Sequence, residues 1–148
     1  MKISDIKIYK VKPRWIFVKL STDEGISGWG EMISGTKTET VVAGGYEIGK
    51  KLIGRNPFEI ERLWQEMHRS FFRGGPINGT IISGLEMALW DIKGKALNLP
   101  VYELLGGAAR DRIRVYSWIG GDRPSDVAEQ AQARVDKGFT AIKMNATS

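Results

Sequence analysis

The chain has 148 residues, of which 42% are hydrophobic and 26% are charged, a composition typical of a folded globular protein. It contains no cysteine, which excludes disulfides and thiolate chemistry, and its net charge of +5 is scattered along the chain, so we expect no nucleic-acid partner. No apolar run approaches the roughly 20 residues that span a bilayer, and no signal-peptide core is present at the start. We therefore expect a cytoplasmic protein with no membrane contact.

The first part of the sequence predicts three antiparallel strands. Ile6 and Ile8 alternate with polar residues, and a second apolar run covers residues 15–20. Residues 22–25, Thr-Asp-Glu-Gly, form a turn signal that leads into a third run at 26–31.

Helices are expected next. Residues 38–53 place apolar side chains on one side, although three glycines weaken this helix. The segment from Asn56 to Glu59 has the form of a capping box with proline at the first helical position. A further helix is predicted over residues 78–97, with Pro100 beyond its end. Apolar residues follow the capping box at helical spacing, at Ile60, Leu63, Trp64, Met67 and Phe71.

The remainder of the chain alternates strand and helix. Residues 113–119 are predicted as an apolar strand, 125–137 as an alanine-rich helix closed by Gly138, and 139–145 as a second strand. Strands joined by such a helix are parallel, and in a β/α barrel the residues at their carboxyl ends form the active site.

Two domains are expected from this order of elements. Residues 1–110 would form an α+β domain with a three-stranded antiparallel sheet, and residues 111–148 would begin a β/α barrel. A barrel of this kind needs roughly 250 residues, so we expect its remainder beyond Ser148 and expect the chain alone to be inactive. Because the expected barrel strands have open edges, we also expect a homo-oligomer or aggregation.

Four segments carry a family resemblance. They are GISGWGE at 25–31, FRGGPI at 72–77, ALWDIKGKALNLPVYELLGG at 88–107 and YSWIGGDRP at 116–124. Together they resemble the enolase superfamily, in its mandelate racemase group, and most closely the acid-sugar dehydratases of the galactonate type. The resemblance extends over essentially the whole chain, and it implies a capping domain of three strands and a helix bundle that closes over a modified barrel.

For the mechanism, the resemblance implies loss of the proton alpha to the carboxylate of a sugar acid such as galactonate, followed by loss of the 3-hydroxyl as water. It implies Mg²⁺ as the cofactor, because a divalent cation stabilises the charge of the enediolate. The metal ligands and the catalytic histidines are implied beyond Ser148, so no metal ligand is assigned within the chain. Gluconate or mannonate dehydration, racemisation and epimerisation remain open, as does a stand-alone module without catalysis.

Lys143 and Asn145 occupy the place of the family's Lys-x-Lys pair at the end of the second barrel strand. The second lysine is the base in the racemases, and an amide such as Asn145 is no useful proton acceptor, so we do not expect racemase chemistry from this face of the substrate site. The resemblance gives Lys143 an electrostatic role at the substrate carboxylate and gives Asn145 a hydrogen bond to the substrate. Without the resemblance, the residues favour a surface lysine and a capping asparagine.

Arg14, Trp15 and Glu31 are the other candidate substrate-binding residues. Arg14 and Trp15 lie in the expected connection between the first two strands, where the family's capping domain places a loop over the barrel mouth. Glu31 begins the second such loop. An arginine there suits a polyhydroxy acid, but a solvent-facing arginine, a tryptophan at the core edge and a turn glutamate explain the same residues equally well.

Two further polar residues are expected to have structural roles. His68, the only histidine, falls beside Trp64 on a helix face, which favours packing over catalysis. Asp91 lies inside a predicted helix, and we expect it to pair with Lys95 rather than bind a metal.

Overall fold

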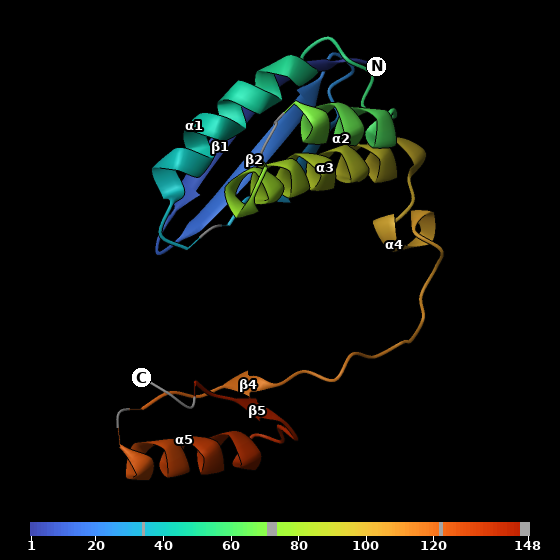
Figure 1. Cartoon of the computed structure of the whole chain (residues 1–148). Coiled ribbons are helices and arrows are strands. Elements are labelled where there is room, and N and C mark those ends of the chain that lie inside the picture. The colour runs from blue at the N-terminus through green and yellow to red at the C-terminus, as the bar shows by residue number, and fades with distance from the viewer. Residues whose placement is uncertain (34, 71–73, 122, 146–148) are drawn as a thin grey trace. The chain divides into compact units, whose positions relative to one another are not determined.

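The computed structural model describes residues 1–33, 35–70, 74–121 and 123–145. The chain divides into two compact units, Met1–Gly107 and Ala108–Ser148 (Figure 1). None of the helices in the described residues combines the length and the apolar composition that a membrane crossing requires.

The first unit is built on an antiparallel sheet of β1 (Ile3–Val11), β2 (Trp15–Thr22) and β3 (Ser27–Glu31), in that spatial order. This confirms the three strands predicted from the alternation of apolar and polar residues. In β2 every second side chain is buried, and this pattern fixes the register because a slip by one residue would turn the apolar set toward solvent.

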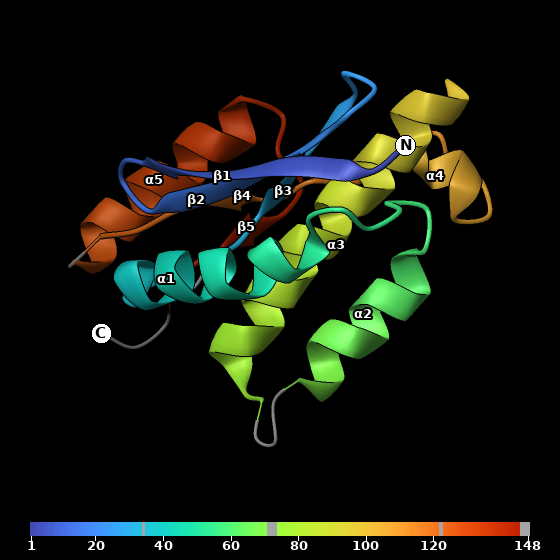
Figure 2. The ribbon, with the colours of Figure 1, turned by 90° about the horizontal axis from the view of Figure 1, so that it is seen from above.

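Helices cover the inner face of this sheet (Figure 2). The longest helix carries Ile81, Leu85, Leu89 and Ile92, all with no exposed surface, and the spacing of three and four residues places them on one helical face. They form one hydrophobic core with the inner residues of the sheet. The helical elements of this unit are α1 (Thr38–Gly49), the short 3₁₀ helix η1 (Lys50–Leu52), α2 (Ile60–Arg69), α3 (Pro76–Leu97) and α4 (Val101–Leu104).

Glycines allow α3 to lie directly against β3. A Cβ atom at Gly28 would overlap the carbonyl oxygen of Ala88, and one at Gly30 would overlap the carbonyl oxygen of Gly84. Any side chain at these positions would therefore push the helix backbone away from the strand. The glycine-rich sequence of β3 is explained by this contact with α3.

The capping box predicted at Asn56 is wrong. The side-chain Oδ1 of Asn56 accepts a hydrogen bond from the Phe58 N–H at 3.0 Å. The backbone carbonyl of Asn56 accepts one from the Glu59 N–H at 3.2 Å. These bonds form a turn with proline in its second position, and α2 begins only at Ile60, without a side-chain cap. Phe71, expected on the apolar face of this helix, and part of the FRGGPI segment lie outside the described residues.

An ion pair joins the segment after η1 to α2. Arg55 donates to both carboxylate oxygens of Glu66, with Nη1–Oε2 at 2.6 Å and Nη2–Oε1 at 2.9 Å, and Arg62 Nε adds a bond of 3.1 Å to Oε1. The hydrogen bonds from Arg55, aided by Arg62, lower the pKa of Glu66 from 4.5 to about 2.

Glu66→Gln is expected to remove a pH-dependent contribution to stability. The pKa of Glu66 is lowered in the folded state, so the carboxylate stabilises the fold above its unfolded pKa of 4.5, and this contribution is lost as the pH falls toward 2. We expect urea unfolding to show a difference between parent and variant that is constant above about pH 5.5 and shrinks below about pH 4.

The matched control for this prediction is Glu61→Gln on the same helix. Glu61 accepts a hydrogen bond from the Gln65 side chain, four residues later, at 2.9 Å. A difference between the parent and Glu66→Gln that does not change between pH 7 and pH 3, or that follows the control, would contradict the role assigned to the Arg55 contact.

The second unit contains a parallel pair of short strands joined by a helix. The two strands are held by hydrogen bonds from the Ser117 N–H to the Ala141 carbonyl at 3.1 Å and from the Ile119 N–H to the Lys143 carbonyl at 2.9 Å. The elements are β4 (Ser117–Trp118), α5 (Pro124–Asp136) and β5 (Ile142–Lys143).

The strands predicted over residues 113–119 and 139–145 are therefore shorter in the structure than expected. Only two residue pairs form the ladder between β4 and β5. Ile113, Val115 and Tyr116 are strongly exposed, at 77%, 61% and 56%. Their apolar sequence predicted a strand, but a strand also needs a partner along its whole length, and within the described residues β4 and β5 pair only with each other.

Candidate functional site

Arg14, Trp15 and Glu31 lie at one end of the sheet in the first unit. Arg14 is in the turn between β1 and β2, Trp15 is the first residue of β2, and Glu31 is the last residue of β3. The register pairs Phe17 with Glu31 and Val11 with Trp15, which brings the start of β2 beside the end of β3. Strand alternation then places Trp15 and Glu31 on the same outer face.

The side chains at this end of the sheet are accessible. Arg14 is exposed, Trp15 is 42% exposed although it is a large aromatic residue, and Glu31 is half-buried. A guanidinium group, an aromatic face and a carboxylate can together bind a molecule that carries hydroxyl groups and an acid group.

The backbone next to Glu31 is held firmly. Met32 is fully buried, and its N–H donates to the Ile16 carbonyl at 2.8 Å. The Thr80 hydroxyl on α3 donates to the Ile33 carbonyl at 2.7 Å. The segment that leaves β3 is thereby fixed to both β2 and α3, so that Glu31 is presented from a rigid part of the fold.

Aromatic side chains on the outer face of the sheet were missed in the sequence analysis. The rings of Tyr9 on β1 and Trp29 on β3 lie 5.4 Å apart, and Lys19 Nζ on the middle strand lies 5.7 Å from the Trp29 ring. The sequence could have predicted this group, because strand alternation and the register of the hairpins place these three residues on one face of the sheet. Trp29 is nevertheless 44% exposed.

Lys143 and Asn145 lie in the second unit. Lys143 is the last residue of β5, beside Trp118 of β4, and Asn145 follows two residues later. Both side chains are exposed, and Lys143 Nζ lies 5.7 Å from the centroid of the Tyr116 ring. The structure thus places both residues at the carboxyl end of a parallel strand, as the sequence predicts, and it adds an aromatic neighbour for the ammonium group.

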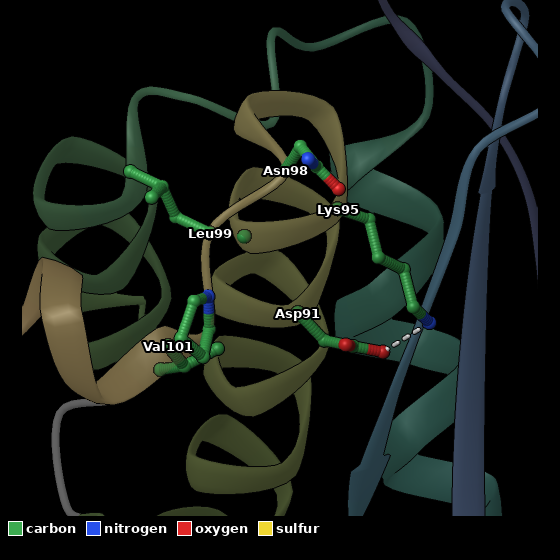
Figure 3. A pocket seen from close by; sticks show the side chains of 7 residues that line it. Asp91, Lys95, Asn98, Leu99 and Val101 are labelled. Atoms are coloured by element: carbon green, nitrogen blue, oxygen red, sulfur yellow. Dashed lines mark hydrogen bonds and ion pairs between the residues drawn. The ribbon is translucent and has the colours of Figure 1, made fainter.

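The predicted pair of Asp91 and Lys95 is confirmed. Lys95 Nζ lies 2.7 Å from Asp91 Oδ2, at the border of an open pocket of about 340 Å³ near the end of α3 (Figure 3). Asp91 also accepts a hydrogen bond from the Trp29 N–H, and Lys95 donates one to the Ser27 carbonyl. Because both charged groups are already paired, the pocket offers few free polar groups to a ligand. The other lining residues are Gly94, Asn98, Leu99, Pro100 and Val101.

His68 lies on α2 and is packed against an aromatic neighbour. The His68 ring stacks on Trp64 at 4.9 Å between centroids and 9° between planes, which agrees with a packing role. Within the described part of the chain, no group of three or more histidine, aspartate or glutamate side chains could hold a metal ion.

Comparison with protein families gives a match over residues 9–106 to the N-terminal domain of the mandelate racemase / muconate lactonizing enzyme family. The chain is 53% identical over 146 residues to a D-galactonate dehydratase from Variovorax paradoxus strain S110, and 50% identical to one from Pectobacterium atrosepticum. In both cases the alignment covers 98% of this chain and 38% of the relative.

Solved structures show the same likeness. A member of the enolase superfamily from Salmonella Typhimurium matches 97% of this chain and 42% of its own with a TM-score of 0.89 at 35% identity. An enolase from Pantoea ananatis with bound D-gluconate and Mg matches 97% of this chain and 36% of its own, with a TM-score of 0.85 at 35% identity. The chain spans less than half the length of each of these relatives.

Proposed function

Because the chain belongs to the mandelate racemase / muconate lactonizing enzyme family, we propose that it forms the N-terminal part of an acid-sugar dehydratase that acts on D-galactonate. The observation that carries this proposal is the identity, above one half over almost the whole chain, to the D-galactonate dehydratase of Variovorax paradoxus. The sheet and helices of the first unit match the capping domain of the family. The second unit, with its parallel strands, is the proposed beginning of the barrel.

In the proposed reaction, a base removes the proton from C2 of the sugar acid, the C3–O bond breaks, and the hydroxyl leaves as water. The remaining enol becomes a 2-keto-3-deoxy acid. Negative charge grows on the carboxylate as the C2 proton leaves, and a fixed positive charge beside it lowers the barrier. We assign this charge to Lys143, because it is exposed at the carboxyl end of β5.

Asn145 and the sheet end of the first unit have binding roles in this proposal. The Asn145 amide can donate to and accept from a sugar hydroxyl, but it cannot serve as the base. Arg14 and Glu31 supply donors and an acceptor for the polyhydroxy chain, and Trp15 supplies an apolar surface for its C–H groups. The shared position of these three residues at one accessible end of the sheet supports their assignment as one group.

Mg²⁺ is the proposed cofactor. The Pantoea ananatis structure holds Mg together with D-gluconate. We expect the ligands in the part of the enzyme beyond the aligned segment. No role in holding the ion is assigned to any residue of this chain.

A chimera tests the proposed function. Residues 1–148 of this chain would replace the aligned N-terminal segment of the Variovorax paradoxus enzyme, which is similar over 146 residues. We expect the chimera to convert D-galactonate to the keto-deoxy acid in the presence of Mg²⁺, and we expect the 148-residue chain alone to form no product.

The controls separate misfolding from failure of the proposal. The unmodified relative gives the reference rate, and circular dichroism with size-exclusion chromatography shows whether the chimera is folded. A folded chimera without activity on D-galactonate would contradict the proposal, whereas product from the chain alone would contradict the assignment of the catalytic groups to another segment.

D-Gluconate dehydration is the second candidate, because the Pantoea ananatis structure contains D-gluconate. The same chimera distinguishes the two substrates by their values of kcat/KM. The homo-oligomer expected from the sequence stays a prediction, which light scattering on the chimera would test.

A further inference from the structure

Side chains of α3 bind the outer edge of β3. The Trp29 N–H donates to Asp91 Oδ2 at 2.9 Å, and Lys95 Nζ donates to the Ser27 carbonyl at 2.8 Å. Lys95 Nζ also donates to Asp91 Oδ2 at 2.7 Å, which links the two contacts (Figure 3). An ion pair of one helix thus engages two backbone groups of one strand.

The spacing of these residues explains the geometry. Ser27 and Trp29 are two residues apart, so their backbone groups point to the same side of β3, away from the pairing with β2. Asp91 and Lys95 are four residues apart, so they are neighbours on one face of α3. The glycine contact between α3 and β3 described above brings the helix close enough for both side chains to reach the strand.

The opposite edge of the sheet has a similar arrangement. The Ile8 N–H of β1 donates to the Tyr46 hydroxyl of α1 at 3.2 Å. Near the start of β1, the Ile3 N–H donates to the Arg55 carbonyl at 2.9 Å, and the Gly54 N–H donates to the Ile3 carbonyl at 2.7 Å. Backbone groups on both outer strands are therefore bound by other parts of the same unit.

We propose that Asp91, Lys95 and Tyr46 close the two edges of this sheet against pairing with a strand of another copy of the chain. Unpaired N–H and C=O groups on an edge strand attract further strands. A charged pair and a hydroxyl that already bind these groups must be displaced before a new strand can pair. This role is independent of the proposed dehydratase activity, and it gives Asp91 and Lys95 a structural purpose.

A crossed experiment on the 148-residue chain tests the proposal by amide hydrogen exchange, measured by NMR. In Asp91→Ala we expect the Trp29 amide to exchange at least tenfold faster, with the Ile8 amide unchanged. In Tyr46→Phe, which removes only the hydroxyl, we expect faster exchange at Ile8 and no change at Trp29. Equal acceleration of both amides in both variants would indicate a general loss of stability and would overturn the proposal, as would no acceleration in either.

If Asp91→Ala does not fold, Asp91→Asn decides the matter for β3. The neutral amide oxygen is a weaker acceptor than the carboxylate, so the Trp29 amide should still exchange faster than in the parent while Ile8 stays unchanged. An unchanged Trp29 amide, or equal acceleration at both amides, would overturn the proposal.

Self-association provides the second readout. At equal concentration, we expect light scattering to show more self-association for Asp91→Ala than for the parent chain. Glu61→Ala is the matched control, because it breaks a contact with Gln65 at the same spacing of four residues on α2. Equal association of the two variants would overturn the protective role.

Discussion

Gly30→Ala is expected to lower the free energy of unfolding by about 3 kcal/mol, the upper part of the range for overpacked sites. The new Cβ atom would overlap the carbonyl oxygen of Gly84. Both groups belong to backbone, one in β3 and one in α3, so no side chain can rotate away to make room. Relief requires α3 to move off the sheet, which would open the core on which the helix packs.

Gly79→Ala is the matched control for this substitution. Gly79 lies on α3 as well, and a Cβ atom there would have no neighbour within 4 Å. Alanine at this exposed helical position should stabilise the protein by about 0.5 kcal/mol, because it reduces the freedom of the unfolded chain. Urea unfolding of the two variants should therefore give changes of opposite sign. If the free energy of unfolding of Gly30→Ala lay within about 0.5 kcal/mol of the parent value, the close contact between β3 and α3 would be contradicted.

The sequence was sufficient for the sheet and for the Asp91–Lys95 pair, because both depend on local spacing. Alternation by two residues predicts the strands, and a separation of four residues predicts the pair on a helix. It was not sufficient for the Trp29 N–H that binds the same carboxylate, since Trp29 and Asp91 are 62 residues apart. A contact of that kind depends on how α3 lies on the sheet. Glycine at position 30 allows this close packing, but its presence in the sequence does not predict it.

The turn at Asn56 and the strands of the second unit show two further limits. Asparagine followed by proline satisfies the pattern of a helix cap and that of a turn, and the local sequence does not separate them. The strand predicted at residues 113–119 is apolar enough, but strand length is set by its partners, and only Ser117–Trp118 is paired.

The candidate site residues form two groups, one in each unit of the chain. Arg14, Trp15 and Glu31 share a sheet end because hairpin register requires it. The position of Lys143 and Asn145 at the end of a parallel strand follows from the β/α/β order of the second unit, whereas their roles at the substrate rest on the family resemblance. The aromatic neighbour of Lys143, Tyr116, was not foreseen, because it directly precedes β4 and lies 27 positions away from Lys143 in the sequence.

Lys143→Met in the chimera is expected to lose rate out of proportion to stability. The substitution keeps most of the side-chain volume and removes the charge that the proposal places beside the substrate carboxylate. The interaction of Lys143 with the Tyr116 ring, at 5.7 Å, is exposed. Its loss should cost no more than about 1 kcal/mol of stability. The loss of transition-state stabilisation should be at least about 1.4 kcal/mol, which is a tenfold loss of kcat/KM.

Lys137→Met is the control for this substitution, since Lys137 is an exposed lysine at the end of α5 in the same unit. It should leave both turnover and the thermal midpoint of the chimera close to those of the unsubstituted chimera. A loss of rate shared by both variants would indicate that the net charge of the unit matters rather than the position of Lys143.

The ratio of kcat/KM for D-galactonate between the unsubstituted chimera and its Lys143→Met variant, measured with Mg²⁺ and set beside their thermal melts, tests the central claim most directly. We predict a ratio of at least about ten with a nearly unchanged melting temperature. Near-normal turnover in a folded Lys143→Met chimera would contradict the claim that this chain contributes a charged group to the chemistry.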